Sequence, residues 1–102
     1  MVQFDVHRAA GHSEPPYFVI LQSDLLRAVK TVVVAPLYPS TERATPLLPR
    51  LHPVFDTADG RMVLMPTLMA AVRRNFLGAQ IASLAEHRDD IIAAIDLLFT
   101  GV

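Results

Sequence analysis

The stretch DIIAAIDLLFTGV, residues 90–102, decides the fold class because its apolar residues recur at helical spacing. Intervals of three and four residues place an apolar stripe on one helix face. Just before it, Ser83 and Glu86 have the spacing of a capping box, in which a hydroxyl and a carboxylate satisfy the first free amides of a helix. We therefore predict a helix over about 84–99. Its apolar stripe consists of Ile91, Ile92, Ile95, Leu98 and Phe99.

The end of this helix departs from the usual charge pattern. A helix C-terminus carries partial negative charge, and cations commonly occupy the last turn. Here the last turn contains no Lys or Arg, and Asp96 adds a negative charge. Local choices that break a folding rule often mark functional surfaces. We therefore expect the tail to contact another molecule.

The residues upstream of the helix have strand patterns. Residues 2–7, VQFDVH, alternate apolar and polar, which predicts a strand with one buried face. Residues 17–22, YFVILQ, form a continuous apolar run, typical of a strand covered on both faces. Residues 31–37, TVVVAPL, predict a third strand that ends near Pro36. The intervening 8–16 contains glycine and a double proline, so we expect a loop there.

The middle of the chain is rich in proline. Five prolines in 36–53 predict a loop and an edge strand, because proline cannot donate to a strand ladder. Asp59-Gly60 lies between two apolar runs, 52–57 and 61–65, and indicates a hairpin. The pattern of 66–72 fits either a short strand or a helical turn. The predicted fold is mainly β (β-rich α+β): one domain, 1–102, in which a small antiparallel sheet or barrel carries a C-terminal helix.

Composition narrows the function classes. Of 102 residues, 52% are hydrophobic and 19% charged, which is more apolar surface than a small monomer needs and favours a homodimer or a partner groove. The net charge is −1 and the only basic run is Arg73-Arg74, so we expect no direct nucleic acid binding. The absence of cysteine, of a signal-like N-terminus and of a long apolar run indicates a cytoplasmic protein without membrane contact.

Catalytic and metal-binding motifs are missing. The four histidines do not have HxxxH or HExxH spacing, so we expect no metal and no cofactor. An acid–base group could still form in space from His7, His12, Asp24, Glu86 and His87, but any small domain contains such a set. The residues alone therefore favour a non-enzymatic interaction domain.

The C-terminal segment 77–102, together with short stretches upstream, resembles the CcdB toxin family. The upstream stretches are QFDV, FVILQSDLL, VVAPL, LHPV and TLMAAV, in the family's order. The resemblance covers nearly the whole chain. In the tail it rests on Gly78, Ile81-Ala82, Leu84, His87-Arg88, Asp90-Ile91, Ala94-Ile95, Leu97, Phe99 and Thr100-Gly101-Val102.

The resemblance implies a specific fold and function. The fold would be a small SH3-like β-barrel, with a five-stranded sheet, a small second sheet and a C-terminal helix, assembled as a symmetric homodimer. The function would be that of a toxin in a type II toxin–antitoxin module. Such a toxin inserts its paired C-termini into the DNA gyrase A-subunit dimer and traps the enzyme on cleaved DNA, without breaking a bond itself. The module would also regulate its own transcription.

The resemblance also implies a topoisomerase-binding site on two segments. Phe99 and Gly101 match the family outright, Val102 replaces an isoleucine, and Asp96 replaces an asparagine. Ser23, Leu25 and Leu26 match a family Ser-Asp-aliphatic-aliphatic stretch. A structural role competes with binding at each position: burial at a strand end for Leu25, and packing of the helix face for Phe99.

Thr100 is the main departure, because the family has a tryptophan there. A tryptophan contributes about 150–250 Å² of contact, and losing such an anchor costs about 2 kcal/mol or more. Three hypotheses follow: a gyrase with a changed pocket, topoisomerase IV as the target, or a homologue that binds antitoxin without poisoning.

The remaining expectations concern the antitoxin and a different toxin class. The resemblance implies a CcdA-like antitoxin whose disordered arm folds on the toxin. The loops 8–16 and 37–53 are candidate contact regions for the antitoxin.

A MazF-like endoribonuclease is the alternative from another class, since MazF-type toxins share the barrel but cleave RNA. Its positive charges would come from Arg27, Lys30, Arg73 and Arg74.

Overall fold

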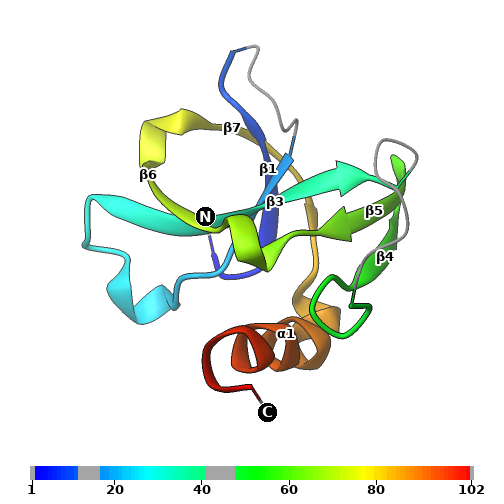
Figure 1. The fold of residues 1–102 in the computed structure, drawn as a ribbon. Helices are drawn as coiled ribbons and strands as arrows, with labels where there is room; N and C mark the ends of the chain where they lie inside the picture. Colours follow the sequence, from blue (N-terminus) through cyan, green and yellow to red (C-terminus); the bar gives the residue numbers. More distant parts are fainter. Residues whose placement is uncertain (1, 12–16, 41–47, 102) are drawn as a thin grey trace.

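The computed structural model describes residues 2–11, 17–40 and 48–101. They form a strongly curved antiparallel sheet with one α-helix, α1 (Arg88–Thr100), below it (Figure 1). Short 3-10 turns η1 (Asp24–Leu26), η2 (Pro66–Leu68), η3 (Arg74–Phe76) and η4 (Ala85–His87) connect the elements. The strands are β1 (Asp5–Ala9), β2 (Tyr17–Ile20), β3 (Thr31–Pro39), β4 (Val54–Thr57), β5 (Gly60–Leu64), β6 (Ala70–Arg73) and β7 (Leu77–Ser83).

The long strand β3 organises the sheet. The main path runs β4-β5-β3-β2-β1-β7, and β6 joins β3 beside it. The first half of β3 pairs with β6, and its second half pairs with β5. The sheet therefore branches at β3 and curls into a half-barrel. The predicted mainly β fold with a C-terminal helix is confirmed, although the strands form one connected sheet rather than a sheet plus a small second one.

Helix α1 covers the core of the half-barrel. Ile91 and Ala94 are both completely buried, and Ile92 and Ile95 pack partly buried beside them. Burying one such aliphatic side chain stabilises the fold by about 1.5–3 kcal/mol. The predicted stripe is therefore correct except at its end, where Phe99 is 68% exposed. The buried cluster that contains Ile91 also includes Phe4, Val6, Val19, Leu21, Ala35, Leu37, Phe55, Met62, Leu64 and Leu84.

The helix begins later than predicted. The α-helix starts at Arg88, and its N-cap His87 makes no side-chain capping bond. Ser83 does act as a cap, but for the preceding 3-10 turn: its Oγ accepts from the Ala85 amide at 3.2 Å. The predicted capping box is therefore wrong, because residues 85–87 form the 3-10 turn η4. Asp89 and Asp90 lie in the first turn of α1, as expected.

The first strand is buried on both faces, not on one. It starts at Asp5, which is 3% exposed, and His7 is 6% exposed. The Asp5 carboxylate accepts from the Val2 amide at 2.9 Å. The His7 Nδ1 atom lies 2.9 Å from the Gly78 carbonyl oxygen of β7. Strand β7, which pairs with β1, was not predicted. The alternation of apolar and polar residues alone therefore did not show that Asp5 and His7 are buried.

Two prolines belong to the central strand β3, which contains Pro36 and ends at Pro39, whereas the sequence predicted a strand that ends near Pro36 and a loop and edge strand over 36–53. Pro36 and Pro39 belong to β3, which has neighbours on both sides. The Pro36 carbonyl accepts from the Met65 amide at 3.0 Å, so the Pro36 nitrogen faces the same side. On that side β3 changes partner between Val34, paired with β6, and Leu37, paired with β5. No ladder bond is therefore required of the proline nitrogen.

The predicted hairpin is confirmed. Strands β4 and β5 pair from Val54↔Val63 to Thr57↔Gly60. Gly60 has a φ of 110°, which a residue with a side chain rarely adopts. Thr57 Oγ1 fixes the turn by accepting from the Asp59 amide at 3.2 Å and donating to the Gly60 carbonyl at 2.8 Å. The ambiguous 66–72 contains both expected forms, the turn η2 followed by most of β6.

Candidate functional site

The C-terminal end of α1 presents an apolar side chain to solvent. Phe99 is 68% exposed, and Asp96 and Thr100 are exposed on the same last turn. Gly101 ends the helix in the left-handed conformation, with φ of 75°, and its amide donates to the Leu97 carbonyl at 3.0 Å. This is the usual glycine stop, which bends the chain away from the helix axis. Val102 lies outside the described residues.

The polar groups of this turn are arranged around the helix end. The Thr100 hydroxyl donates to the Asp96 carbonyl at 2.7 Å, so it caps its own helix. No basic residue lies in the last turn, and Asp96 is negative. The helix dipole and Asp96 therefore give this end a negative potential around Phe99. A partner that receives Phe99 needs an apolar pocket with a positive or donor-rich rim.

The second predicted segment is the turn η1, which exposes two leucines. Leu25 is 93% exposed and Leu26 49%. Ser23 caps the turn, because its Oγ accepts from the Leu25 amide at 3.2 Å and its carbonyl accepts from the Leu26 amide at 3.0 Å. Burial of Leu25, the competing structural interpretation, is therefore wrong. The capping turn itself is confirmed.

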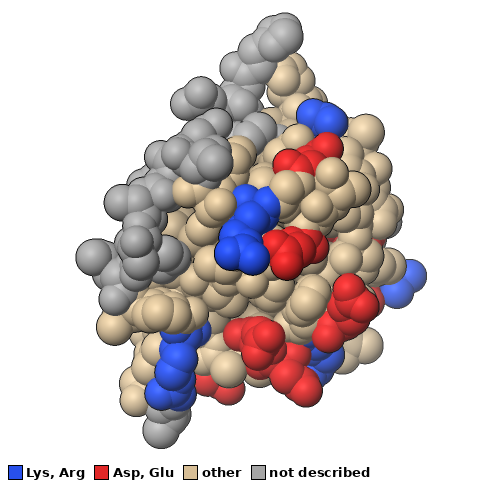
Figure 2. Space-filling model, turned by 90° about the vertical axis from the view of Figure 1, so that its right-hand side faces the viewer, with Lys and Arg blue, Asp and Glu red and all other residues tan. Residues whose placement is uncertain are grey.

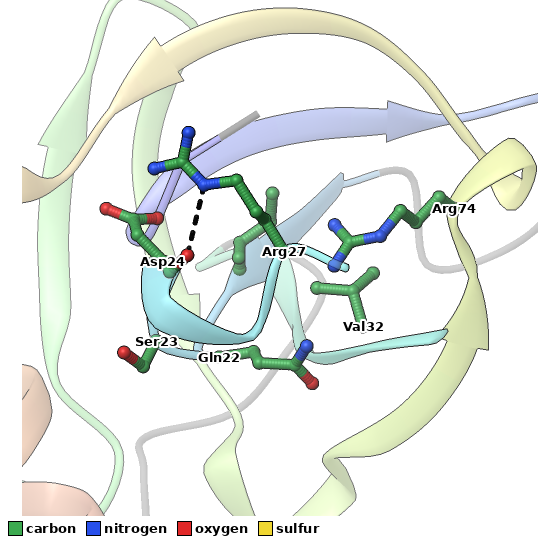
Figure 3. A pocket seen from close by; sticks show the side chains of 7 residues that line it. Gln22, Ser23, Asp24, Arg27, Val32 and Arg74 are labelled. Carbon is green, nitrogen blue, oxygen red and sulfur yellow. Dashed lines mark hydrogen bonds between the residues drawn. The ribbon is translucent and has the colours of Figure 1, made fainter. Parts of the chain in front are cut away.

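Side chains from two neighbouring segments hold η1 in place (Figure 3). The Gln22 amide nitrogen donates to the Thr31 carbonyl at 3.2 Å, and its oxygen accepts from the Val33 amide at 3.2 Å. Arg74 Nε donates to the Val29 carbonyl at 3.0 Å. The space between these groups measures only about 10 Å³, roughly one water. The leucines are therefore displayed on a well-supported turn.

The structure places the predicted site residues in two groups. Ser23, Leu25 and Leu26 share η1, and Asp96, Phe99, Thr100 and Gly101 share the end of α1. Within the described residues, no hydrogen bond or ion pair connects the two groups. Each group is an independent projection with apolar side chains at its surface.

The candidate acid–base residues do not assemble into one site. His7 contacts the Gly78 carbonyl, and the Asp24 carboxylate accepts from the Gln3 amide at 2.8 Å. Glu86 and His87 form a separate pair at 3.5 Å. His12 lies outside the described residues. In the part of the chain that the structure describes, no group of three or more His, Asp or Glu could hold a metal ion, and none of its helices is long and apolar enough to span a membrane.

Two surface depressions were not apparent from the sequence. One, about 380 Å³, lies between α1 and the segment before β4; its lining residues are Pro49, Arg50, Pro53, Val54, Asp90 and Ala93. The other, about 490 Å³, is lined by Lys30, Thr31, Arg73, Arg74 and Asn75. Each combines residues that are distant in sequence, so no linear pattern identifies it.

Comparison with protein families decides the assignment. Residues 3–101 match the family model described as CcdB protein. This chain belongs to the CcdB family. The family is one of toxin–antitoxin toxins, which matches the resemblance of the C-terminal segment and of the ordered upstream stretches. Membership concerns nearly the whole chain, including both groups of candidate site residues.

Solved structures of mycobacterial toxins, one of them a MazF toxin, have the same fold as this CcdB-family chain. The Mycobacterium tuberculosis toxin MazF-mt6 is 21% identical, with a TM-score of 0.75 over 93% of this chain and 95% of its own. A mycobacterial endoribonuclease in complex with its cognate antitoxin is 15% identical, with a TM-score of 0.72 over 94% and 91%. An Mtb toxin is 20% identical, with a TM-score of 0.71 over 92% and 99%. At these identities the similarity establishes the fold alone.

Proposed function

We propose that this protein poisons a type II topoisomerase, with the gyrase A subunit as the first candidate, by trapping the enzyme on cleaved DNA. The observation that carries the proposal is the exposure of Phe99, an aromatic side chain 68% exposed at the end of the terminal helix. An aromatic side chain left in water at a helix tip is a suitable anchor for an interface. Family membership supports a toxin function, and the target is our inference.

The proposed mechanism is mechanical rather than catalytic. Phe99 enters an apolar pocket of the target, while the left-handed turn at Gly101 directs the tail away from the helix axis. Leu25 and Leu26 supply a second apolar contact. The toxin breaks no bond. It stabilises the topoisomerase in its cleaved state, because it binds that state more tightly than the resealed one.

We further propose that the toxin acts as a symmetric homodimer in the cytoplasm. A two-fold axis would present two copies of the helix end to a two-fold target such as the gyrase A-subunit dimer. The abundance of hydrophobic residues, 52% of a 102-residue chain, supports a self-complementary interface.

Thr100 determines how strongly the poison acts. Its hydroxyl already donates to the Asp96 carbonyl, so the residue offers a partner only a methyl group and an acceptor oxygen. The target pocket has either changed to suit threonine, in gyrase or in topoisomerase IV, or the chain binds antitoxin without poisoning. Plasmid cleavage assays with gyrase and with topoisomerase IV of the source organism distinguish these cases.

Thr100→Trp should strengthen trapping of gyrase from a species whose own toxin carries tryptophan. An indole that fills its pocket contributes about 2 kcal/mol, equivalent to roughly thirtyfold in affinity. The measurement is the toxin concentration that gives half-maximal double-strand breaks in supercoiled plasmid. Thr100→Ser is the control, because it keeps the hydroxyl and adds no surface. Trapping by neither the wild type nor Thr100→Trp, with either enzyme, would exclude the poison mechanism.

We place the antitoxin arm in the 380 Å³ groove beside α1. Val54 is 42% exposed, and the prolines 49 and 53 add apolar surface, while Arg50 and Asp90 can bind polar groups of a peptide. Disordered arms bind by burying apolar anchors in grooves of this kind. The groove includes the end of the predicted contact region 37–53. Residues 41–47 of that region lie outside the described residues. In the other candidate loop, 8–16, the same holds for 12–16.

Val54→Arg should therefore weaken antitoxin binding at least tenfold, because it fills the groove and buries a charge. Binding of the antitoxin's C-terminal peptide, measured by isothermal titration calorimetry, provides the test. Arg61→Ala, on the neighbouring exposed hairpin, is the control. Topoisomerase trapping should be unchanged in both variants. Equal peptide affinity for Val54→Arg and wild type would place the antitoxin elsewhere.

An endoribonuclease is the second candidate, because the solved structures of similar fold include a MazF toxin and a mycobacterial endoribonuclease. RNA cleavage would need cations and an acid or base on one face. Arg27, Lys30, Arg73 and Arg74 supply the cations, and Asp24 supplies a carboxylate that lines one hollow with Arg27 and Arg74. Cleavage of RNA by the purified protein, abolished by Arg27→Ala and Lys30→Ala, would favour this function over topoisomerase poisoning.

A further inference from the structure

The basic depression, defined by Lys30, Thr31, Arg73, Arg74 and Asn75, collects cations that are distant in sequence. Strand pairing brings them together: β3 and β6 run antiparallel with Thr31 opposite Arg73. Lys30 precedes one strand, and Arg74 follows the other. The depression measures about 490 Å³, ample for one phosphodiester group and its water.

No carboxylate lies among these lining residues. In the described part of the chain, neither Lys30 nor Arg73 forms an ion pair. Arg74 is fixed from behind, with Nε donating to the Val29 carbonyl at 3.0 Å and Nη2 to the Leu26 carbonyl at 3.4 Å. Lys30 and Arg73, with the Arg74 guanidinium beside them, give the hollow a local positive potential.

Many of the acidic residues lie on other elements, so the net charge of −1 hides a partial separation of charge. Glu86, Asp89, Asp90 and Asp96 are all exposed on η4 and α1. Figure 2 shows acidic side chains gathered on the lower part of one face, the level at which Figure 1 places α1. Asp24 is nearer, because it lines the adjacent hollow with Arg27 and Arg74, but it does not line the basic depression itself.

We propose that the basic depression binds the phosphate backbone of duplex DNA without reading its sequence. Its chemistry consists of three cations and two neutral hydrogen-bonding side chains, the Thr31 hydroxyl and the Asn75 amide, which suit phosphate oxygens. The sequence had predicted no nucleic acid contact because it contains only one basic pair. The spatial grouping of Lys30 with Arg73 and Arg74 is the reason for the different inference.

The lining favours duplex DNA over single-stranded RNA. Single strands are usually held by aromatic side chains on which bases stack. The basic depression has no aromatic lining residue. The adjacent Phe76 packs edge-to-face on Phe18, with ring centroids 5.2 Å apart, and so is engaged inside the protein. A site without a stacking surface contacts the backbone only.

The test is fluorescence anisotropy of a labelled DNA duplex over a range of salt concentrations, with purified protein and no topoisomerase. Each phosphate neutralised contributes about 0.9 to the slope of log K against log salt, so three contacts give about −2.7. The double variant Lys30→Ala/Arg73→Ala should reduce this slope by about two thirds and weaken low-salt binding at least tenfold. Arg61→Ala/Arg88→Ala makes the same change in net charge at other exposed positions and should bind like wild type.

Three results would overturn the proposal: no binding even at low salt, equal losses in the two double variants, or tighter binding of single-stranded RNA of the same sequence. Lys30→Gln/Arg73→Gln keeps the aliphatic stems and repeats the test if the alanine variant does not fold. Since the assay contains no topoisomerase, its outcome is independent of the poison mechanism.

Discussion

Replacing Phe99 with alanine should abolish most of the affinity for the proposed topoisomerase target while leaving the fold intact. The ring is 68% exposed, so folding gains little from it, and stability should change by less than about 0.5 kcal/mol. In the proposed complex the ring is an anchor, and truncating an anchor costs about 2 kcal/mol or more, roughly thirtyfold in affinity. Binding to the purified A subunit and urea unfolding measure the two effects separately.

Leu48→Ala is the matched control for Phe99→Ala. Leu48 is another large apolar residue, 54% exposed, but it lies outside both candidate binding groups. The control should leave target affinity unchanged. If Phe99→Ala destabilised the protein and left affinity unchanged, Phe99 would belong to a packed interface, such as one between two copies, and the proposed insertion would be wrong.

The fold class was predictable because the sequence patterns are strong where one face is buried. The apolar spacing that includes Ile91 and Ile95 required a helix packed on the rest of the chain. The pair Asp59-Gly60 required a tight turn, and the turn confirms it with Gly60 at a φ of 110°. In both cases a local physical constraint points to the same structure as the tertiary packing.

The strand β7 and the interior prolines were missed for a common reason. Their structure depends on partners that are far away in sequence. Leu77–Ser83 alternates only weakly and becomes a strand by pairing with β1. Pro36 is tolerated in a central strand because β3 changes partner there. Propensity rules describe single residues. They cannot predict that β3 lacks a hydrogen-bonding partner for the proline nitrogen where it changes from β6 to β5.

The candidate site was predictable from family resemblance rather than from periodicity. The helical spacing placed Phe99 with the buried stripe, whereas the structure exposes it one turn beyond Ile95. Leu25 was likewise open to a buried role and is 93% exposed. Periodicity indicates which face of an element is apolar, but the extent of the surface that covers this face comes from the rest of the fold.

Replacing Ile91 with alanine should be the most damaging truncation in the helix. Ile91 is completely buried and packs in the main core cluster with residues of β1, β2, β3, β4 and β5. Removing three heavy atoms from such a site costs about 2–5 kcal/mol, including the cavity that remains. The free energy of unfolding of a domain of this size is about 5–15 kcal/mol, so the variant should be marginally stable. The lower urea midpoint at an unchanged m-value would measure this loss.

Ile92→Ala provides an internal comparison, because it removes the same atoms one position further along the helix. Ile92 is only partly buried, so its loss leaves a smaller cavity and should cost clearly less than the loss of Ile91. Both variants must be compared at one protein concentration, since a dimer's apparent stability depends on it. Equal losses in the two variants would mean that Ile92 is as enclosed as Ile91 in solution. The obvious cover for it would then be a second copy of the chain, which would support the proposed homodimer through this helix face.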